Sequence, residues 1–437
     1  MQTIDTLIKA RWLVPVVPEN TVYDHHAVAI QAGRIIDILP SHEATDRYQA
    51  RELIELTKHA VIPGFINAHT HTPMTLFRGM ADDMPLMDWL EKRIWPAEGR
   101  WVDERFVEDG TQLAIAEMLR NGTTCFADMY FFPDVIAKTA QAAGIRACVG
   151  LILLDFPTIW AGSPDEYISK GLELHDHLLN DPLVKTMFAP HAPYTVSDEP
   201  LSRIRIIADE LEIPIQCHIH ETAFEVMDAV QKTGMRPLER LDSLGLISPN
   251  LMAVHMTQLT EEEIDLIADN GANVIHCPES NLKLASGYCP IDALISAGAN
   301  VALGTDGAAS NNDLDMMGEM RTAALLAKNV AGNASAVPGF QALKMATLNG
   351  AISLGIADQT GSLEIGKSAD CVAIDLSAIR TQPVYDVVSQ IVYSADSSQI
   401  TDVWVEGRQL LKQGHHTTIN VEQILETAQQ WRDKITD

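Results

Sequence analysis

The chain has 437 residues, of which 46% are apolar and 21% charged, a composition that excludes a disordered or fibrous protein. Its 31 Lys and Arg against 59 Asp and Glu give a formal net charge of −28. This balance argues against a nucleic acid or an anionic membrane as partner, because phosphate binding needs clustered basic side chains. We therefore expect a soluble protein that acts on a small, neutral or partly cationic molecule.

The N-terminal segment carries an early acidic residue, Asp5, and no small-residue cleavage site, so it predicts no signal peptide. The longest apolar run, residues 149–154, is far too short to span a bilayer. Six scattered cysteines form no CxxC pair, which indicates buried reduced thiols. Together these features predict a cytoplasmic protein.

The two ends of the chain have a similar pattern. The first 60 residues predict short strands with turns, in runs such as LIKARWLV and AVAIQAGRIIDIL. The residues after about position 361 predict the same, before a terminal helix over 421–434. Neither end is self-sufficient, so we expect one small β-sandwich domain formed by residues 1–61 and 361–437. A catalytic domain, residues 62–360, lies between them.

The middle of the chain repeats a helix, a glycine and a short β-branched run that ends in a polar residue. One such helix begins at a capping box on Thr260 and ends at Gly271. Eight runs of this kind, spaced at about one βα unit of roughly 30 residues, predict an α/β fold of the (β/α)₈ barrel type. The runs end near His69, Asp128, Asp155, His191, His218, His255, His276 and Asp306.

The first interval between these runs is about 30 residues longer than a βα unit requires. The excess, residues 72–105, predicts a loop or lid over the mouth of the barrel. Whether that insert closes on a substrate is not indicated by its sequence.

The barrel's C-terminal strand ends, where active sites of this fold lie, carry metal-binding side chains. His69 and His71 are two apart on one strand, so both imidazoles can reach one ion. The fifth strand adds a third imidazole, from His218 or His220, which spacing alone does not separate. With Asp306 from the eighth strand, this set suits one Zn²⁺ with an open position for water. Fe²⁺ or Mn²⁺ fits nearly as well by ligand type.

Two further side chains belong to this predicted centre. Glu221 follows His218 by three residues, where a general acid or base beside a metal-activated water should lie. Its alternative is a solvated loop glutamate. His255 ends the sixth strand, where it can hold the nucleophile or polarise the substrate. The position of His276 supports no particular catalytic role, and a structural role explains this histidine at least as well.

This constellation resembles the amidohydrolase superfamily, through PGFINAHTH, APHAPYTVS, CHIHETAFEV, AVHMTQLT, HCPESNLKLASG and GTDGAASNNDLDM. Within it the chain is most similar to the 5′-methylthioadenosine/S-adenosylhomocysteine deaminases, which are cytosolic, mononuclear zinc enzymes that hydrolyse the 6-amino group of an adenosine moiety. Binuclear relatives carry a modified bridging lysine at the end of the fourth strand. Here Lys185 lies near that strand's start and His191 at its end, which favours one metal.

The resemblance implies a role for each side chain of the centre. The metal ligands are His69, His71, His218 and Asp306, which selects His218 over His220. Glu221 corresponds to the proton shuttle, giving its proton to a ring nitrogen. His255 corresponds to the histidine beside the nucleophile, and Asp306 also takes the proton of the attacking water.

The resemblance also implies the substrate contacts. His191 corresponds to a residue on the purine ring, and Glu98 to one that binds the ribose hydroxyls. Trp89 corresponds to an aromatic residue that lines the nucleoside pocket, the alternative being a side chain that packs on its own loop. Ser310 stands where a small polar contact is expected. Arginines that hold the substrate in some relatives have no clear counterpart in residues 155–167, so the handling of a charged homocysteine tail is open.

Three other functions are alternatives for this sequence. The same ligands serve hydrolases or deaminases of other rings, such as triazines, guanine, 8-oxoguanine or cytosine, although Glu98 and His191 favour a nucleoside. A barrel that lost catalysis and serves as an interaction protein typically loses metal ligands, which are all present here. A polynucleotide deaminase would carry an H-x-E…P-C-x-x-C signature, absent here. The choice among methylthioadenosine, S-adenosylhomocysteine and adenosine is not indicated, and a homo-oligomer is expected only by analogy with similar barrels.

Overall fold

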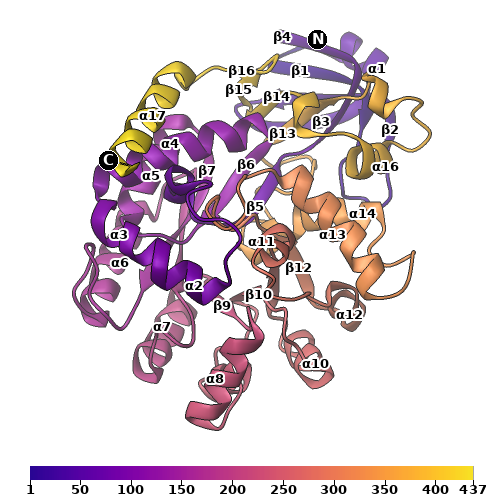
Figure 1. Cartoon of the computed structure of the whole chain (residues 1–437). Coiled ribbons are helices and arrows are strands. Elements are labelled where there is room, and N and C mark those ends of the chain that lie inside the picture. The colour runs from indigo at the N-terminus through magenta and orange to yellow at the C-terminus, as the bar shows by residue number, and fades with distance from the viewer. Residues whose placement is uncertain (437) are drawn as a thin grey trace.

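The computed structural model describes residues 1–436 and contains two eight-stranded sheets (Figure 1). One is parallel throughout, with the strand order β12-β11-β10-β9-β8-β7-β6-β5. Its strands coincide with the eight predicted runs, so the predicted (β/α)₈ barrel is confirmed. They are β5 (Phe65–Thr70), β6 (Thr123–Asp128), β7 (Arg146–Leu153), β8 (Val184–Pro190), β9 (Ile215–Ile219), β10 (Leu251–His255), β11 (Asn273–His276) and β12 (Asn300–Leu303).

Helices surround this sheet on its outer side (Figure 1). The predicted capping box is present, because Thr260 and Glu263 each accept the other's backbone N–H through their side chains. Two helices end at Gly144 and Gly298, whose φ of 82° and 97° places them in the left-handed region that favours glycine. The helices are α4 (Glu104–Arg120), α5 (Pro133–Ala143), α6 (Pro164–Leu178), α7 (Asp198–Leu211), α8 (Ala223–Thr233), α9 (Pro237–Ser243), α10 (Glu261–Asp269), α11 (Pro278–Lys283), α12 (Ile291–Ala297), α13 (Met316–Val330), α14 (Gly339–Met345) and α15 (Leu348–Ser353).

The insert after β5 is helical over most of its length rather than an irregular loop. Pro73 and Pro96 stand in the first turns of two of its helices, where a missing N–H costs nothing. The apolar residues of the insert pack against the main core, and this packing holds the segment in place. Its helical turns are η1 (Thr72–Phe77), α2 (Leu86–Trp89), η2 (Leu90–Ile94) and α3 (Trp95–Trp101).

The second sheet combines strands from both ends of the chain, at the top of Figure 1. β4 pairs with β1 in parallel and with β13 in antiparallel orientation, so it joins the two halves. β1 and β4 are longer than the predicted short strands. The elements are β1 (Gln2–Leu13), β2 (Tyr23–Gln31), β3 (Arg34–Pro40), α1 (Ser41–Arg47), β4 (Tyr48–Pro63), β13 (Cys371–Asp375), η3 (Ile379–Thr381), α16 (Val387–Ser389), η4 (Gln390–Ser394), η5 (Ser397–Gln399), β14 (Ile400–Val405), β15 (Arg408–Lys412), β16 (His415–His416) and the predicted terminal helix α17 (Val421–Thr436).

A buried ion pair connects the barrel to this second sheet. Arg146, at the start of β7, donates from Nε to Asp370 Oδ2 at 3.0 Å and from a terminal nitrogen to Ser368 Oγ at 3.2 Å. Asp370 precedes β13 and also accepts the backbone N–H of Glu406. The Arg146 and Asp370 side chains are almost completely buried, so each charge depends on its partner for compensation.

The barrel closes between its first and last strands through specific groups rather than a strand ladder. Asn67 accepts the Thr305 N–H at 3.0 Å and donates to the Thr305 hydroxyl at 2.8 Å. The Asp306 N–H donates to the His69 carbonyl oxygen at 3.0 Å. Gly304 permits this approach, because a Cβ there would lie 2.8 Å from the Cβ of His69. We call this contact between β5 and the end of β12 the seam.

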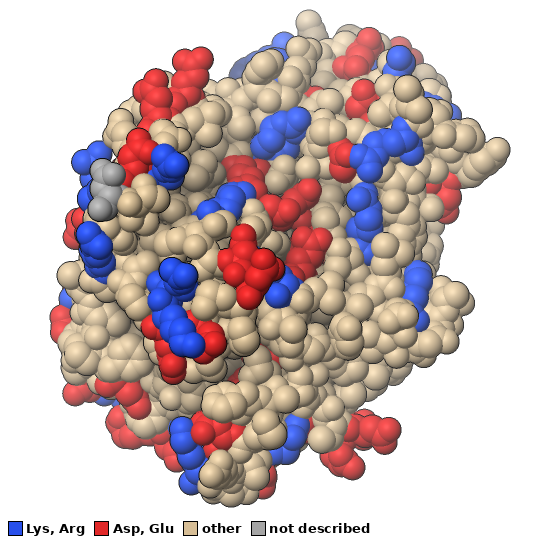
Figure 2. Space-filling model, viewed as in Figure 1, with Lys and Arg blue, Asp and Glu red and all other residues tan. Residues whose placement is uncertain are grey.

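The surface and the thiols agree with the composition. All six cysteines are buried and free, as predicted. No helix within residues 1–436 is both long and apolar enough to cross a membrane. On the face shown in Figure 2, Lys and Arg are interspersed with Asp and Glu and do not gather into one basic surface.

Candidate active site

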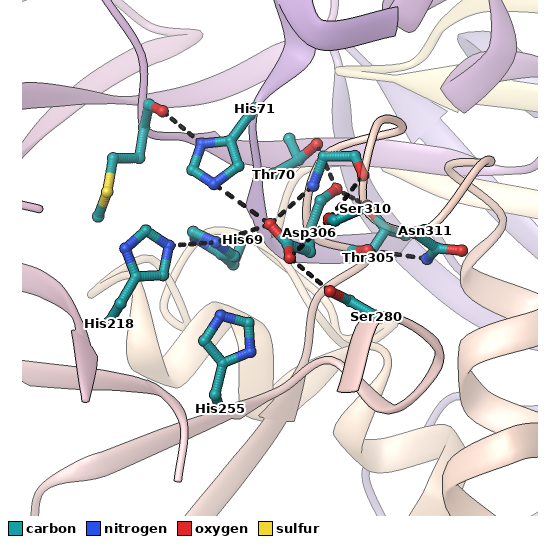
Figure 3. Close-up of polar contacts among 12 residues, drawn as sticks. His69, Thr70, His71, His218, His255, Ser280, Thr305, Asp306, Ser310 and Asn311 are labelled. Carbon is teal, nitrogen blue, oxygen red and sulfur yellow. Dashed lines mark hydrogen bonds and ion pairs between the residues drawn. The ribbon is translucent and has the colours of Figure 1, made fainter. Parts of the chain in front are cut away.

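Four side chains meet at the C-terminal end of the barrel strands. His69 and His71 come from the end of β5, His218 from β9, and Asp306 from the turn after β12. One nitrogen or oxygen from each of the four lies within 4.8 Å of the other three. Figure 3 shows the three rings and the carboxylate pointing toward one another. The structure thus brings together the four residues that the sequence analysis selected.

The outer nitrogen of each imidazole donates to an oxygen of the surrounding barrel. With Nδ1 protonated, every Nε2 carries a lone pair directed at the centre of the group. Two of these acceptor nitrogens, on His69 and His218, lie only 3.1 Å apart, a contact that a shared cation would stabilise. The donor set therefore fits a metal ion. The oxygens are Gln216 Oε1 for His69 at 2.8 Å, the Met129 carbonyl for His71 at 2.5 Å and the His191 carbonyl for His218 at 2.8 Å.

Asp306 divides its two carboxylate oxygens between different partners. Oδ2 accepts hydrogen bonds from the hydroxyls of Ser280 at 2.6 Å and Ser310 at 2.8 Å (Figure 3). Oδ1 faces the imidazoles, 3.2 Å from His71 Nε2 and 3.5 Å from His69 Nε2. The φ of Asp306 is 60°, a left-handed conformation that costs a non-glycine residue energy and is typical of functional sites.

His220 lies outside this cluster. Its Nε2 accepts the backbone N–H of Leu238 at 3.2 Å, and its Nδ1 lies 3.8 Å from Glu263 Oε2. Both partners belong to the outer helices α9 and α10. Of the two histidines that the spacing left open, only His218 contributes a nitrogen to the group of four.

Glu221 lies at the edge of the cluster in a buried position. Its Oε2 is 3.8 Å from His255 Nε2, and the side chain is only 8% exposed. Burial raises the pKa of the Glu221 carboxyl to about 8, and the negative charge of Asp306 acts in the same direction. The carboxyl therefore carries a proton at neutral pH, the state that a general acid needs.

The backbone that presents Glu221 is held by two neighbouring side chains. The Glu225 carboxylate accepts the N–H of His220 at 3.0 Å and that of Glu221 at 2.7 Å. The Thr257 hydroxyl donates to the Glu221 carbonyl at 2.7 Å. His220 has a φ of 54°, so the turn is bent into a costly conformation that these bonds stabilise.

His255 and His276 end neighbouring strands but have different surroundings. His255 Nδ1 donates to Asn281 Oδ1 at 2.9 Å, which leaves Nε2 as an acceptor facing Glu221. Burial lowers the His255 pKa, which favours the neutral ring. His276 is buried, its Nδ1 has no hydrogen-bond partner among the described residues, and it is not part of the cavity wall.

A cavity of about 730 Å³ lies over the metal cluster. This size accommodates a nucleoside and matches typical ligand pockets. The four residues selected as substrate contacts, Trp89, Glu98, His191 and Ser310, all line it. Trp89 also packs within its own insert, since its indole N–H donates to the Ala81 carbonyl at 3.1 Å. Both interpretations of Trp89 thus agree with its position.

Burial in this cavity shifts the pKa values of Glu98 and His191 in opposite directions. Burial raises the pKa of Glu98 to about 7, although the Tyr130 hydroxyl donates to its Oε1 at 2.8 Å. Burial lowers the pKa of His191 to about 3, so this ring is neutral at pH 7. Its Nδ1 lies 3.0 Å from Thr195 Oγ1. Ser310 differs from the expectation in one respect, because its hydroxyl is already bonded to Asp306.

Sequence reasoning missed several groups that complete the site. Gln216 stands two residues before His218 on the same strand, so strand alternation offered a signal for its inward position. Asn281, Tyr130 and Glu225 gave no comparable signal, because each meets its partner only through the tertiary fold. The alternation rule applies equally to Asn67, two residues before His69.

The amidohydrolase family model matches residues 60–410 of this chain. A 5-methylthioadenosine/S-adenosylhomocysteine deaminase of Saccharophagus degradans is 50% identical over 99% of this chain and 97% of its own length. A relative of the same name from Thermodesulfovibrio yellowstonii is 40% identical over 98% of each chain.

Solved structures agree with this assignment. An adenosine deaminase from Xanthomonas campestris with bound zinc has a TM-score of 0.99 and 52% identity, covering 100% of this chain and 99% of its own. A zinc complex of atrazine chlorohydrolase from Arthrobacter aurescens has a TM-score of 0.90 over 98% and 99% of the two chains, but at 22% identity it supports the fold alone. The chain belongs to the amidohydrolase family, together with relatives named 5-methylthioadenosine/S-adenosylhomocysteine deaminases.

Proposed function

We propose that the chain is a metal-dependent aminohydrolase that removes the 6-amino group of an adenosine-type thio-nucleoside. The substrate is 5′-methylthioadenosine, S-adenosylhomocysteine or adenosine, and the products are the inosine-type nucleoside and ammonia. The observation that carries this proposal is the buried Glu221 beside a three-histidine, one-aspartate cluster under a nucleoside-sized cavity. Relatives of that name aligned over nearly the whole chain support it.

One Zn²⁺ per subunit would be held by the Nε2 atoms of His69, His71 and His218 and by Asp306. Imidazole and carboxylate ligands suit zinc, and Fe²⁺ or Mn²⁺ takes the same donors. Lys185 donates to the Asp181 carbonyl at the far end of β8, which supports a site for one metal rather than two. When bound, the metal supplies Lewis acidity that makes a water molecule nucleophilic near neutral pH.

Glu221 begins the reaction by giving its proton to N1 of the adenine ring. This proton draws electron density from C6 and makes that carbon electrophilic. The buried carboxyl holds the proton at pH 7 and can deliver it without a solvent intermediary.

The attacking water then loses one proton to Asp306 as its oxygen bonds to C6. His255 accepts a hydrogen bond from this water through Nε2, because its Nδ1 is fixed by Asn281. Asp306 then passes this proton to the 6-amino group, so that the C6–N bond breaks and ammonia leaves. The hydroxyl proton that remains on C6 passes to Glu221 and restores its protonated carboxyl. The balance is one water consumed and one ammonia released for each nucleoside.

The remaining residues position the nucleoside. Glu98 accepts hydrogen bonds from the ribose hydroxyls, with Tyr130 fixing its carboxylate. The neutral His191 contacts the purine ring, and Trp89 supplies an aromatic wall.

The chain is also divided into two domains under this proposal. We infer that residues 62–360 form the catalytic barrel domain, and that residues 1–61 and 361–437 form one further domain. The shared sheet of β1–β4 and β13–β16 supports this division. Six buried free thiols support a cytoplasmic location.

The first experiment is ammonia release by zinc-loaded protein against a panel of nucleosides, free bases and a substituted triazine. We expect rapid turnover of at least one of the three nucleosides methylthioadenosine, S-adenosylhomocysteine and adenosine, and poor turnover of adenine, guanine, 8-oxoguanine and cytosine. Activity on a free base or the triazine alone would retain the metal site and refute the nucleoside assignment. Protein without bound metal and without turnover would instead indicate an interaction protein.

A further inference from the structure

The cavity over the metal cluster is lined mostly by apolar side chains. Among the described residues that line it, none is a lysine or an arginine. Its acidic side chains are Glu98, Glu221 and Asp306. A carboxylate on a ligand would therefore lose part of its hydration in this cavity without a lysine or arginine among these lining residues to compensate it.

Four large side chains that line the cavity are also exposed to solvent, so they form its outer rim. Trp95 and Tyr194 are 38% and 43% exposed, and Phe156 and Ile159 are 46% and 66% exposed. Exposed aromatic and aliphatic groups gathered at a pocket mouth are typical of a ligand-binding surface. We call these four residues the apolar collar.

Two polar groups near residues 156–159 of the apolar collar, Thr158 and Lys170, are already engaged. Thr158, between Phe156 and Ile159, accepts a hydrogen bond from the Tyr167 hydroxyl at 2.7 Å. Lys170 pairs with Glu166 at 2.8 Å and also donates to a backbone carbonyl.

Lys283, on another side of the cavity, is also engaged in an existing ion pair. It precedes the lining residue Leu284 and pairs with Asp82 at 2.7 Å. Using Lys170 or Lys283 to bind a ligand anion would require breaking a bond that already exists.

The shape of a purine nucleoside decides which of its groups reaches this rim. The reacting carbon, C6, lies on the pyrimidine side of the bicyclic ring, whereas the ribose is attached at N9 on the opposite side. With C6 at the metal cluster, the 5′ substituent is the end of the molecule nearest the mouth. It therefore lies against the apolar collar.

We propose that the apolar collar of Trp95, Phe156, Ile159 and Tyr194 is a binding subsite for an uncharged, apolar 5′ substituent. The preferred substrate class is a neutral 5′-alkylthio nucleoside, and the zwitterionic homocysteinyl nucleoside is a poor substrate. This inference rests on the proposed function, since it assumes that C6 of an adenine reacts at the metal cluster.

The test compares kcat/KM of the zinc-loaded enzyme for methylthioadenosine, butylthioadenosine, adenosine and S-adenosylhomocysteine. The kcat/KM of both alkylthio nucleosides should exceed that of S-adenosylhomocysteine by about tenfold or more, and the kcat/KM of adenosine should lie below that of methylthioadenosine. The reason is that the apolar collar gains binding energy from apolar contact and offers no ion pair. Equal kcat/KM for methylthioadenosine and S-adenosylhomocysteine would overturn the inference while the proposed function stands. Turnover of no nucleoside would overturn both.

A charge introduced into the collar tests the cause directly. Ile159→Arg should raise the ratio of kcat/KM for S-adenosylhomocysteine to that for methylthioadenosine by roughly fivefold, the effect of one exposed ion pair. Ile159→Gln is the matched control, because it removes the apolar side chain without adding charge. Since Ile159 is 66% exposed, neither change disturbs the core. An equal gain from both variants would contradict the electrostatic explanation.

Discussion

The proton of Glu221 is the smallest feature on which the proposed chemistry depends. Replacing its carboxyl by an isosteric amide removes that proton and leaves the buried volume unchanged. We predict that Glu221→Gln lowers kcat by about 10²–10⁴, the usual contribution of a general acid. Metal content should stay at the wild-type level, because Glu221 is outside the group of four ligands. Steady-state kinetics and metal analysis measure the two quantities.

A matched control for that variant is Glu239→Gln. Glu239 accepts the Arg236 N–H in the capping box of α9 and lies on the surface, so its loss should leave kcat within a factor of about two. Near-normal turnover by Glu221→Gln would refute the assignment of the general acid.

The two buried glutamates of the cavity predict the pH dependence of the reaction. Glu98 must be ionised to accept ribose hydrogen bonds, so with a pKa of about 7 its contribution is lost as the pH falls below 7. Glu221 must be protonated, so with a pKa of about 8 its contribution is lost as the pH rises above 8. We predict a bell-shaped kcat/KM with a maximum between about pH 7 and 8. Glu98→Gln should remove the acid limb alone, and an unchanged limb would contradict the role of Glu98.

Single residues also show where sequence reasoning ends. HxH at a strand end predicts two imidazoles on one side, because alternation is a local property. The choice between His218 and His220 is not local, since both point inward by period. It is decided by the turn at His220, whose φ of 54° directs its ring toward α9 and α10.

At the scale of elements, the turn from β9 to α8 positions the general acid. Glu225 stands in the first turn of α8 and accepts two consecutive N–H groups of that turn. We predict that Glu225→Gln lowers kcat by about 10–100-fold, as outer-shell changes do, because the amide can replace only part of this acceptor capacity. KM and metal content should change much less. Kinetics and thermal unfolding measure these effects. If Glu225→Gln lowers the stability but leaves kcat unchanged, Glu225 has only a structural role.

Helices and strands were predicted well where local rules decide them. The capping box at Thr260 and the glycine ends at Gly144 and Gly298 place helix boundaries through backbone chemistry. The insert after β5 was predicted as a loop or lid because its length, not its periodicity, was the signal. Its helical turns are fixed by apolar packing on the core, which no spacing rule contains.

At the scale of the whole molecule, the Arg146–Asp370 pair holds the barrel and the second sheet together. Arg146→Met removes the cation that compensates the buried Asp370, and Asp370→Asn leaves Arg146 only the partly exposed Glu406 carboxylate at 3.6 Å, so we predict that each change lowers the free energy of unfolding by about 3–5 kcal/mol. The double variant should lose clearly less than the sum of the two single variants. Denaturant unfolding of all three measures this coupling, and additive losses would contradict it.

Metal binding should stabilise the barrel unevenly. Three of the four metal ligands, His69, His71 and Asp306, lie at the ends of β5 and β12, the two strands that meet at the seam without a ladder, and the fourth, His218, lies on β9. A ligand that binds only the closed form stabilises the groups that close it. We predict that metal removal speeds amide hydrogen exchange in β5 and β12 more than in β7 and β8. A uniform change across the four strands, measured by mass spectrometry, would show that the seam is held without the metal.

The sheet built from both chain ends has a consequence for synthesis on the ribosome. β4 pairs with β13, yet about 300 residues separate the two strands, and translation at 5–20 residues per second needs roughly 15 to 60 s to cover them. During that time the nascent β4 presents a long open edge, which is a template for pairing with other chains. The β4 edge stays unpaired while the residues of the barrel are synthesised. We therefore expect the nascent chain to depend on chaperones that cover this edge far more than the folded protein does.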